Sequence, residues 1–503
     1  MVVRASRTGI ARRELVAGLA ALAAIPAPAA ARARGFGERV RRKARALARR
    51  PYAAPHRPLP SELAGLDYDG YRELRFRSER AVWRDLGLPF QLQMFPRAGL
   101  HIRPVELFEV VDGEARPIPY RADDFTSRRL DPTAVAPDAG FAGFRIHAPI
   151  NDPARFDEFA VFLGASYFRA VPRGGVYGLS ARAIEVGSGE PGEEFPGFRA
   201  FYVERPAPGH ASLTVHALLD GPSLAGAYSF LITPGEPTVF DVAATLYPRT
   251  PLARAGLAPL TSMFLYGPGE AHAFDDFRPQ VHDSDGLLLA RAEGGREWRA
   301  LCNPRSVQIS RFTEPAAGGF GLTQRQRSFE AFQDLEAHYH RRPSAWVEPR
   351  GAWGPGAVQL VELPARGEGE DNIVASWRPA QPIPADAPFE YAYRLSWTAA
   401  DPSPAPLVPV AAWRAGRGDA EPWRRFVVEF GPVEGANLSE LAADVEVSAG
   451  AVRHVTLQPN PNRRGARLTF EFNGEAAAGA ELRARLLRTG RPVSEDWIRR
   501  WPA

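Results

Sequence analysis

The chain has 503 residues, more than one hydrophobic core normally serves, so we expect at least two folded units. It carries one lysine, Lys43, against 61 arginines, and its net charge is +4 at neutral pH. The positive charge is concentrated at the N-terminus: residues 1–50 have a net charge of +11, and the remaining residues have a net charge of −7. Because the body of the protein is acidic, the basic isoelectric point does not indicate a nucleic-acid partner.

Several other classes of protein are excluded by single features of the sequence. Cys302 is the one cysteine, which rules out an intramolecular disulfide and a zinc site built on several thiolates. No nucleophile elbow, P-loop or dinucleotide fingerprint occurs, so we predict no cofactor. His338 and His340 lie two residues apart with no third ligand nearby, and we predict no metal site. Beyond the first thirty residues, no apolar run reaches the roughly 18–20 residues of a membrane span.

Residues 1–33 are typical of an export signal. Arg12 and Arg13 precede a weakly apolar stretch over 15–25, and small residues over 29–33 offer cleavage sites. Adjacent arginines favour a twin-arginine signal peptide, although Ala11 stands where Ser or Thr is usual. An ordinary secretory leader and an uncleaved helix are the alternatives. The sequence therefore predicts export to the periplasm.

The elements that follow are mostly short strands. Residues 35–50 predict one basic helix that lies on the body as an arm. Alternating apolar residues over 213–215, 228–232 and 239–242, separated by turns rich in Gly, Pro and Asp, predict an antiparallel all-β protein. Residues 328–339 are the best remaining helix candidate.

A proline-rich segment divides the chain near its C-terminus. Prolines spaced two apart over 401–406 favour an extended linker. We therefore expect a large β-sandwich domain over 34–400 and a second domain over 407–503. Strands predicted near 426–430, 452–457, 468–472 and 482–487 suit a small immunoglobulin-like sandwich.

Two acidic segments are the candidates for chemistry. Residues 278–286 contain Asp283 and Asp285, and residues 368–372 contain Glu368 and Asp371, each within turn residues. Either segment can be a solvated turn and no more. Glycoside hydrolysis is the chemistry that uses such a pair, since one carboxyl group protonates the leaving oxygen and the other activates water. The acid must hold its proton near neutrality, through burial or a like-charged neighbour.

Aromatic residues gather in the same part of the chain. Tyr339 and Trp346 lie near Arg325, with Trp353 and Trp377 further on. Flat rings with a polar end pack well against sugar faces. We expect most of these rings to be core, with some lining a groove together with the arginines, among them Arg327 and Arg342.

Several short segments, which follow one another in the same order along the chain, resemble segments of one known family. These are residues 140–144, 164–169, 176–182, 192–196, 261–267, 342–347 and 371–375. They resemble the periplasmic glucan biosynthesis proteins of the G and D types, over a region that runs from about residue 50 to the C-terminus. The twin-arginine leader looks more like the D-type branch.

The resemblance implies a fold, a substrate and a site. The fold is a large galactose-mutarotase-like β-sandwich followed by an immunoglobulin-like domain, and the substrate is a β-1,2-linked glucan. Some members are similar to inverting endo-β-1,2-glucanases, which makes Asp371 the general acid, Asp283 the base acting through water, and Glu368 a support for the acid. We expect the glucan to contact five residues: Tyr339, Trp346, Arg325, Tyr167 and His282.

Membership of such a family does not fix the activity, because fold and catalysis are separable. An endo-β-1,2-glucanase is the leading hypothesis. A transglycosylase on the same glucan, a non-catalytic glucan-binding factor that assists the inner-membrane glucan synthase, and a structural envelope protein without a sugar site are the alternatives. Release of oligosaccharides from the glucan indicates cleavage. Binding without products indicates a binding factor, and absence of binding indicates a structural protein.

Overall fold

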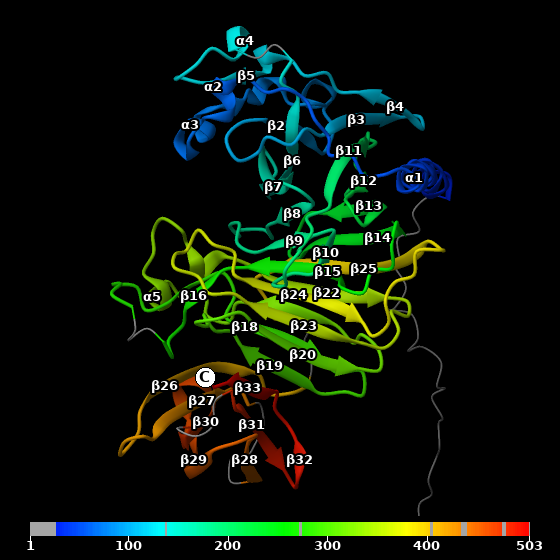
Figure 1. Ribbon diagram of the computed structural model, residues 1–503. Helices are drawn as coiled ribbons and strands as arrows, with labels where there is room; N and C mark the ends of the chain where they lie inside the picture. The colour runs from blue at the N-terminus through cyan, green and yellow to red at the C-terminus, as the bar shows by residue number, and fades with distance from the viewer. Residues whose placement is uncertain are drawn as a thin grey trace, which may run out of the picture.

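The computed structural model describes residues 27–135, 138–270, 274–402, 406–433, 440–474 and 479–501 (Figure 1). The signal peptide predicted for residues 1–33 falls almost wholly outside this part of the chain. In the described part, no helix combines the length and the apolar character that a membrane span requires. Apart from helix α1 (Ala27–Ala48), the elements are nearly all strands, and the predicted all-β class is confirmed.

A ten-stranded sheet forms one layer of the protein. Its strands pair antiparallel in the order β2, β6, β7, β8, β9, β15, β24, β23 and β20, and β10 pairs with β15 beside this path. The strands are β2 (Gln91–Pro96), β6 (Phe141–Asp152), β7 (Arg155–Leu163), β8 (Tyr167–Ala170), β9 (Ser180–Arg182), β10 (Ile184–Val186), β15 (Ala255–Ser262), β20 (Gln308–Glu314), β23 (Gly356–Glu362) and β24 (Ile373–Pro379).

A fifteen-stranded sheet forms the second layer, in the order β28, β31, β33, β19, β18, β21, β22, β25, β14, β13, β12, β11, β3 and β4, with β32 paired to β31. The strands predicted over 213–215, 228–232 and 239–242 are confirmed as parts of β12, β13 and β14. The strands are β3 (Glu106–Val111), β4 (Glu114–Pro117), β11 (Gly197–Glu204), β12 (Leu213–Asp220), β13 (Leu224–Thr233), β14 (Thr238–Pro248), β18 (Gly286–Ala290), β19 (Arg296–Ala300), β21 (Phe320–Thr323), β22 (Ser344–Arg350), β25 (Phe389–Thr398), β28 (Leu441–Val447), β31 (Glu481–Arg488), β32 (Arg491–Pro492) and β33 (Asp496–Arg500).

The main hydrophobic core lies between these two sheets. Phe162 and Phe168 of the ten-stranded sheet stack on Phe240 of the fifteen-stranded sheet, with ring centroids 6.3 and 5.8 Å apart. Side chains alternate along a strand, so the residues between them point the other way. The register places Gln93, Arg145, Val161 and Arg169 in one row on the outer face of the ten-stranded sheet. Three of these four residues are polar or charged.

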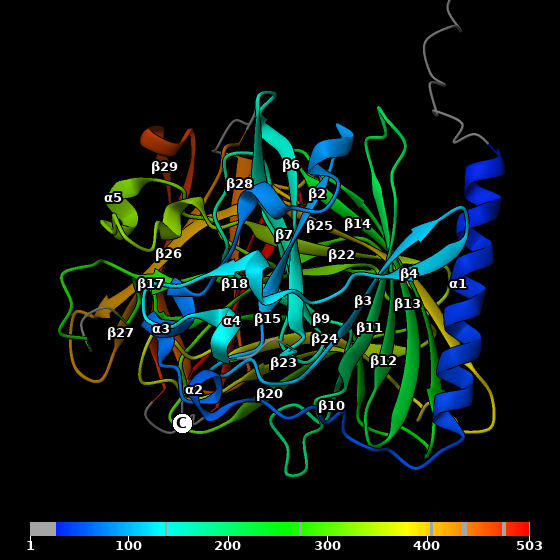
Figure 2. The ribbon, with the colours of Figure 1, turned by 90° about the horizontal axis from the view of Figure 1, so that it is seen from above.

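Helix α1 covers part of the outer face of the fifteen-stranded sheet. Phe36, Val40 and Ala44 recur at helical spacing, and all three are buried against strands β11 to β13. Lys43 donates a hydrogen bond to the hydroxyl of Tyr202, and Phe36 packs against the same ring. Figure 2 shows α1 along one side of the molecule beside β13. The predicted basic helix that lies on the body is confirmed.

The C-terminal strands form a sandwich that shares the large sheet. A four-stranded sheet is ordered β26 (Val410–Arg417), β27 (Arg424–Phe430), β30 (Gly465–Asn473) and β29 (Ala451–Asn460). It packs on β28, β31 and β33, and β33 pairs in parallel with β19. Trp298 and Trp346 from before the predicted boundary share a core with Trp413 and Trp497 from beyond it. The predicted linker therefore lies between strands β25 and β26. The fifteen-stranded sheet and the core of the four tryptophans contain residues from both sides of it.

The helix predicted over residues 328–339 is wrong. Only α5 (Phe329–Phe332) forms, and it ends where Gln333 adopts a left-handed conformation with φ of 55°. The Asp334 carboxylate then accepts hydrogen bonds from the backbone N–H groups of Glu336 and Ala337, which closes a turn in place of further helix. A 3₁₀ turn, η5 (Tyr339–Arg341), follows.

Short elements complete the fold, several of them at the end opposite the C-terminal sandwich (Figure 1). They are α2 (Ser61–Ala64), α3 (Tyr68–Glu73), β1 (Arg75–Phe76), β5 (Phe125–Thr126), α4 (Pro132–Val135), the pair β16 (Phe264–Tyr266) and β17 (Val281–His282), and the 3₁₀ turns η1 (Ser78–Arg80), η2 (Arg84–Leu86), η3 (Ala122–Asp124) and η7 (Pro461–Arg463).

Candidate active site

The pair of β16 and β17 brings the first acidic segment to the site. His282, the last residue of β17, is fully buried and stacks on Phe264 of β16, with ring centroids 5.5 Å apart. Burial lowers the pKa of His282 to about 3. A neutral, buried ring supports the hairpin from behind and does not present itself to a ligand. Asp283 follows directly, and its backbone N–H donates to the carbonyl of Met263 over 2.8 Å.

Asn372 fastens the second acidic segment to this hairpin. Its side-chain oxygen accepts from the backbone N–H of Phe264 over 2.8 Å. Its amide nitrogen donates to the carbonyls of Phe264 and Leu363, each over 3.0 Å. Because the amide is buried and bonded on both sides, it fixes the loop that carries Asp371 against the strand beside Asp283. The two segments that the sequence singled out therefore converge.

Asp283 is buried and ion-paired. Its carboxylate accepts a hydrogen bond from Arg342, and the Arg342 guanidinium also lies 4.1 Å from the ring centroid of Tyr339. Burial raises the pKa of Asp283, the Arg342 charge opposes that rise, and the charge of Asp371 adds to it. The two aspartates are thus electrostatically coupled, which two unrelated surface turns would not be.

Asp371 is the accessible member of the pair. Its side chain is 37% exposed and lies 3.8 Å from the guanidinium of Arg169 on β8. Tyr167 stands two residues before Arg169 on the same face, where burial raises the pKa of its hydroxyl. Period-two alternation from Tyr167 would have found Arg169, which sequence reasoning missed as a site residue.

Glu368 is held by two donors. It accepts from the Tyr339 hydroxyl and, over 2.9 Å, from the guanidinium of Arg278. Burial raises the pKa of Tyr339, and the bond to Glu368 raises it further. Arg278 also bonds to Asp334 over 2.9 Å and to Asp276. The first acidic segment, the turn after α5 and the loop of Asp371 are therefore joined by one guanidinium.

Four of the five residues expected to contact the glucan are not free to do so. His282 and Tyr339 are buried beside the carboxylates, and Trp346 and Arg325 lie away from them. Trp346 of β22 is 3% exposed, because its neighbours Ala345 and Val347 face the main core and alternation turns the Trp346 ring into the second core. Arg325 donates two hydrogen bonds to Glu495, over 3.1 and 2.9 Å, and so connects the large sandwich to the C-terminal strands. Trp353 and Trp377 are main-core residues.

Asp285, two residues after Asp283, has different hydrogen-bond partners. It is buried at the start of β18, and burial raises its pKa to about 6. One carboxylate oxygen accepts from the backbone N–H of Arg325 over 3.0 Å, and the other has no partner among the described residues.

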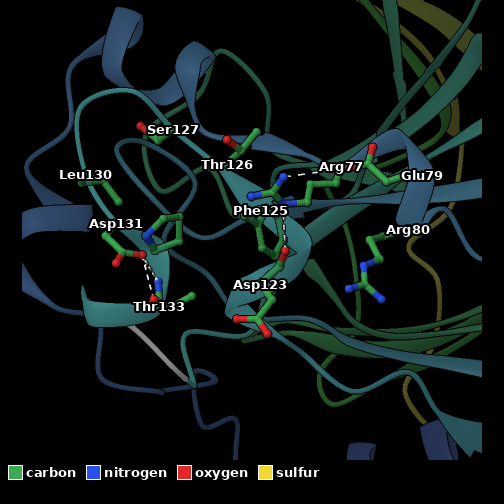
Figure 3. A pocket seen from close by; sticks show the side chains of 11 residues that line it. Arg77, Glu79, Arg80, Asp123, Phe125, Thr126, Ser127, Leu130, Asp131 and Thr133 are labelled. Atoms are coloured by element: carbon green, nitrogen blue, oxygen red, sulfur yellow. Dashed lines mark hydrogen bonds and ion pairs between the residues drawn. The ribbon is translucent and has the colours of Figure 1, made fainter.

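A hollow of the described surface lies away from these carboxylates. It measures about 900 Å³ and lies at η1, η3, β5 and α4 (Figure 3). Its acid Asp131 accepts from the backbone and hydroxyl of Thr133, over 3.0 and 2.7 Å, and Arg77 bonds to the carbonyl of Asp123. The lining of the hollow contains none of the carboxylates of the two acidic segments.

A group with metal-binding residue types lies on the C-terminal sheet. Over the described part of the chain, Asp419, His454 and Glu471 are close enough to share an ion. Glu471, however, already accepts hydrogen bonds from Arg425 over 2.9 Å and from Arg453 over 3.0 Å. The arginines neutralise the acids, so this group does not call for a metal.

Comparisons with known proteins agree with the resemblance seen in the sequence. The sequence model of a family described as "Periplasmic glucan biosynthesis protein, MdoG" matches residues 36–501. A solved α-galactosidase of glycoside hydrolase family 36 from Geobacillus stearothermophilus covers 51% of this chain and 39% of its own, at 9% identity and a TM-score of 0.26. A likeness that weak carries no structural argument.

Relatives named "Glucans biosynthesis protein G" match almost end to end. The one from Rhodopseudomonas palustris (strain ATCC BAA-98 / CGA009) is 48% identical and covers 97% of this chain and 99% of its own. Those from Bradyrhizobium diazoefficiens and Vibrio cholerae serotype O1 (strain ATCC 39541) are 48% and 46% identical, each over 92% of this chain and over 92% and 85% of their own.

These names correct the expected branch. The D-type expectation rested on Arg12 and Arg13, but the similarity is to G-type proteins. An export signal contributes nothing to the packed body, so it is a poor guide to the branch to which that body is similar. The protein is a periplasmic protein of glucan biosynthesis, and it belongs to the MdoG family of periplasmic glucan biosynthesis proteins.

Proposed function

We propose that this protein cleaves the backbone of a β-1,2-linked glucan by an inverting, endo-acting mechanism. The observation that carries the proposal is the convergence of Asp283 and Asp371, which Asn372 fastens together and which are coupled through their charges. Inverting glycosidases place two carboxyl groups about 6.5–9.5 Å apart, so that a water fits between one of them and the sugar.

Asp283 suits the role of general base. A base must be ionised when the substrate arrives, and the hydrogen bond from Arg342 favours the carboxylate against the effect of burial. The residue is 4% exposed, so we expect it to activate the attacking water through intervening waters or hydroxyl groups. The Tyr339 ring, stacked under Arg342, lies beside this path.

Asp371 suits the role of general acid once the glucan is bound. In the free protein its side chain is 37% exposed and lies 3.8 Å from the guanidinium of Arg169. A glucan lying over the carboxyl group would remove water from it, and desolvation favours the protonated form. Glu368, fixed by Tyr339 and Arg278, supports the loop and keeps Asp371 directed towards the glycosidic oxygen.

The test is oligosaccharide release from linear β-1,2-glucan by Asp371→Asn and Glu370→Gln variants. General acid catalysis contributes roughly 10²–10⁴-fold, so we expect the Asp371→Asn rate to fall by about that factor. Glu370 is the matched control, because its carboxylate accepts only from the backbone N–H of Arg366 among the described residues. Undiminished release by Asp371→Asn contradicts the assignment of the acid.

A second candidate is a glucan-handling role in synthesis, by transfer of the cut chain or by binding alone. It is favoured by the names of the relatives, which refer to biosynthesis rather than degradation. Longer products in the same assay support transfer. Saturable glucan binding with no product from the native protein supports binding alone and contradicts the proposal above.

A further inference from the structure

Helix α1 has two faces of opposite character. Phe36, Val40 and Ala44 are buried on the sheet. Arg42 and Arg45 lie on the opposite face of the helix, and Arg49 follows its last residue; all three are exposed. The helix therefore holds to the body through its apolar side and presents guanidinium groups to its surroundings.

The exposed arginines differ from their neighbours in having no acidic partner. Arg39 and Arg41 reach the flanking strands, where they bond to carboxylates over 3.1 and 3.4 Å. Arg42, Arg45 and Arg49 form no ion pair with any residue that the structure describes. These three charges play no part in holding the helix to the sheet and stay available to an external anion.

The distribution of net charge along the chain agrees with this arrangement. Without the predicted signal peptide, residues 34–50 carry a net charge of +7, and the rest of the chain carries −7. A molecule with this asymmetry turns its positive end towards an anionic surface. Guanidinium groups match phosphate geometry well because they donate two parallel hydrogen bonds.

The same face lacks the features of a protein-binding surface. Stable protein interfaces depend on buried aromatic or aliphatic anchors. None of the large exposed apolar residues of the described chain belongs to α1. The helix also cannot insert its apolar side into a bilayer, because the sheet already covers it.

We propose that Arg42, Arg45 and Arg49 dock the protein on anionic phospholipid headgroups at a membrane surface facing the periplasm. The contact is electrostatic, peripheral and reversible. It holds the protein beside the bilayer with no change in its fold.

The experiment is vesicle co-sedimentation of protein recovered from the periplasm, its N-terminus read by mass spectrometry. The vesicles contain phosphatidylcholine alone or mixed with phosphatidylglycerol. We expect binding only to the mixed vesicles at about 0.05 M salt, and release at about 0.5 M salt, where the screening length is only a few ångströms. Replacing all three arginines with Gln should lower the partition coefficient on the order of 100-fold.

A charge-matched control separates this face from net charge. Arg84, Arg463 and Arg491 are exposed on other parts of the surface and form no ion pair with the described residues, so their triple Gln variant removes the same charge. It should bind like the native protein, and both variants should keep the native melting temperature. Absence of binding to the mixed vesicles overturns the proposal, and so does an equal loss of vesicle binding in both variants. Binding of this face to an acidic protein in place of vesicles also overturns it. The readout needs no glucan and is independent of the proposed hydrolysis.

Discussion

The outer faces of the two large sheets show how one strand pattern serves two purposes. Both sheets turn a phenylalanine-rich face into the common core. Outward, the ten-stranded sheet presents polar residues such as Arg145 and Arg169, beside which the coupled carboxylates lie. The fifteen-stranded sheet presents apolar residues such as Leu288 and Trp346, and it is covered by α1 and the C-terminal strands. Outward-facing residues at the same spacing therefore line an open polar face or pack beneath a covering layer, according to which sheet carries them.

The largest effect is expected where the outward face is covered. Trp346→Ala removes a large buried ring from the second core and should lower the free energy of unfolding by about 3–5 kcal/mol. Urea denaturation followed by far-UV circular dichroism measures it. If the variant keeps its stability and loses affinity for glucan, Trp346 belongs to a binding groove and the contrast between the two faces fails.

The next largest effect is expected beside the polar outer face of the ten-stranded sheet, at the ion pair of Arg342 and Asp283. Arg342 opposes the rise in pKa that burial imposes on Asp283, so Arg342→Gln should raise that pKa. A base with a raised pKa is ionised only at higher pH, so the acidic limb of the kcat/KM profile should move to higher pH. We expect a loss of about 100-fold at pH values below the limb.

The adjacent Arg341 provides the control for that measurement. Its guanidinium bonds to the carbonyl of Gly174 and to no carboxylate of the site. Arg341→Gln should therefore leave the pH profile unchanged. An unmoved limb in Arg342→Gln would show that Asp283 is not the group that titrates in the rate.

The smallest effect is expected at the fastening between the two acidic segments. Asn372→Ala leaves the backbone N–H and carbonyl of Phe264 and the carbonyl of Leu363 without their side-chain partner, which should cost about 2 kcal/mol of stability. The loop of Asp371 should also become mobile, and activity should fall more than binding. Amide hydrogen exchange at Phe264 and its neighbours checks this; unchanged protection contradicts the fastening role.

The amino-acid sequence determined the class of fold and singled out the two acidic segments that the fold brings together. Alternating apolar residues marked strands β12, β13 and β14, because alternation is a local consequence of strand geometry. The basic helix over 35–50 could also be predicted from the sequence, since its apolar residues repeat at helical spacing. The two acidic segments stood out because each joins carboxylates to turn residues, and within them the family resemblance singled out Asp283 and Asp371.

Only the tertiary structure decided which residues meet. The sequence places Trp346 beside Tyr339, but β22 turns the Trp346 ring into the second core while Tyr339 reaches Glu368. It gives no sign that Asn372 bonds to β16 or that Arg325 joins the two sandwiches. Which face of a strand becomes a site depends on what the neighbouring sheet covers. That is a long-range property of packing, which no local pattern encodes.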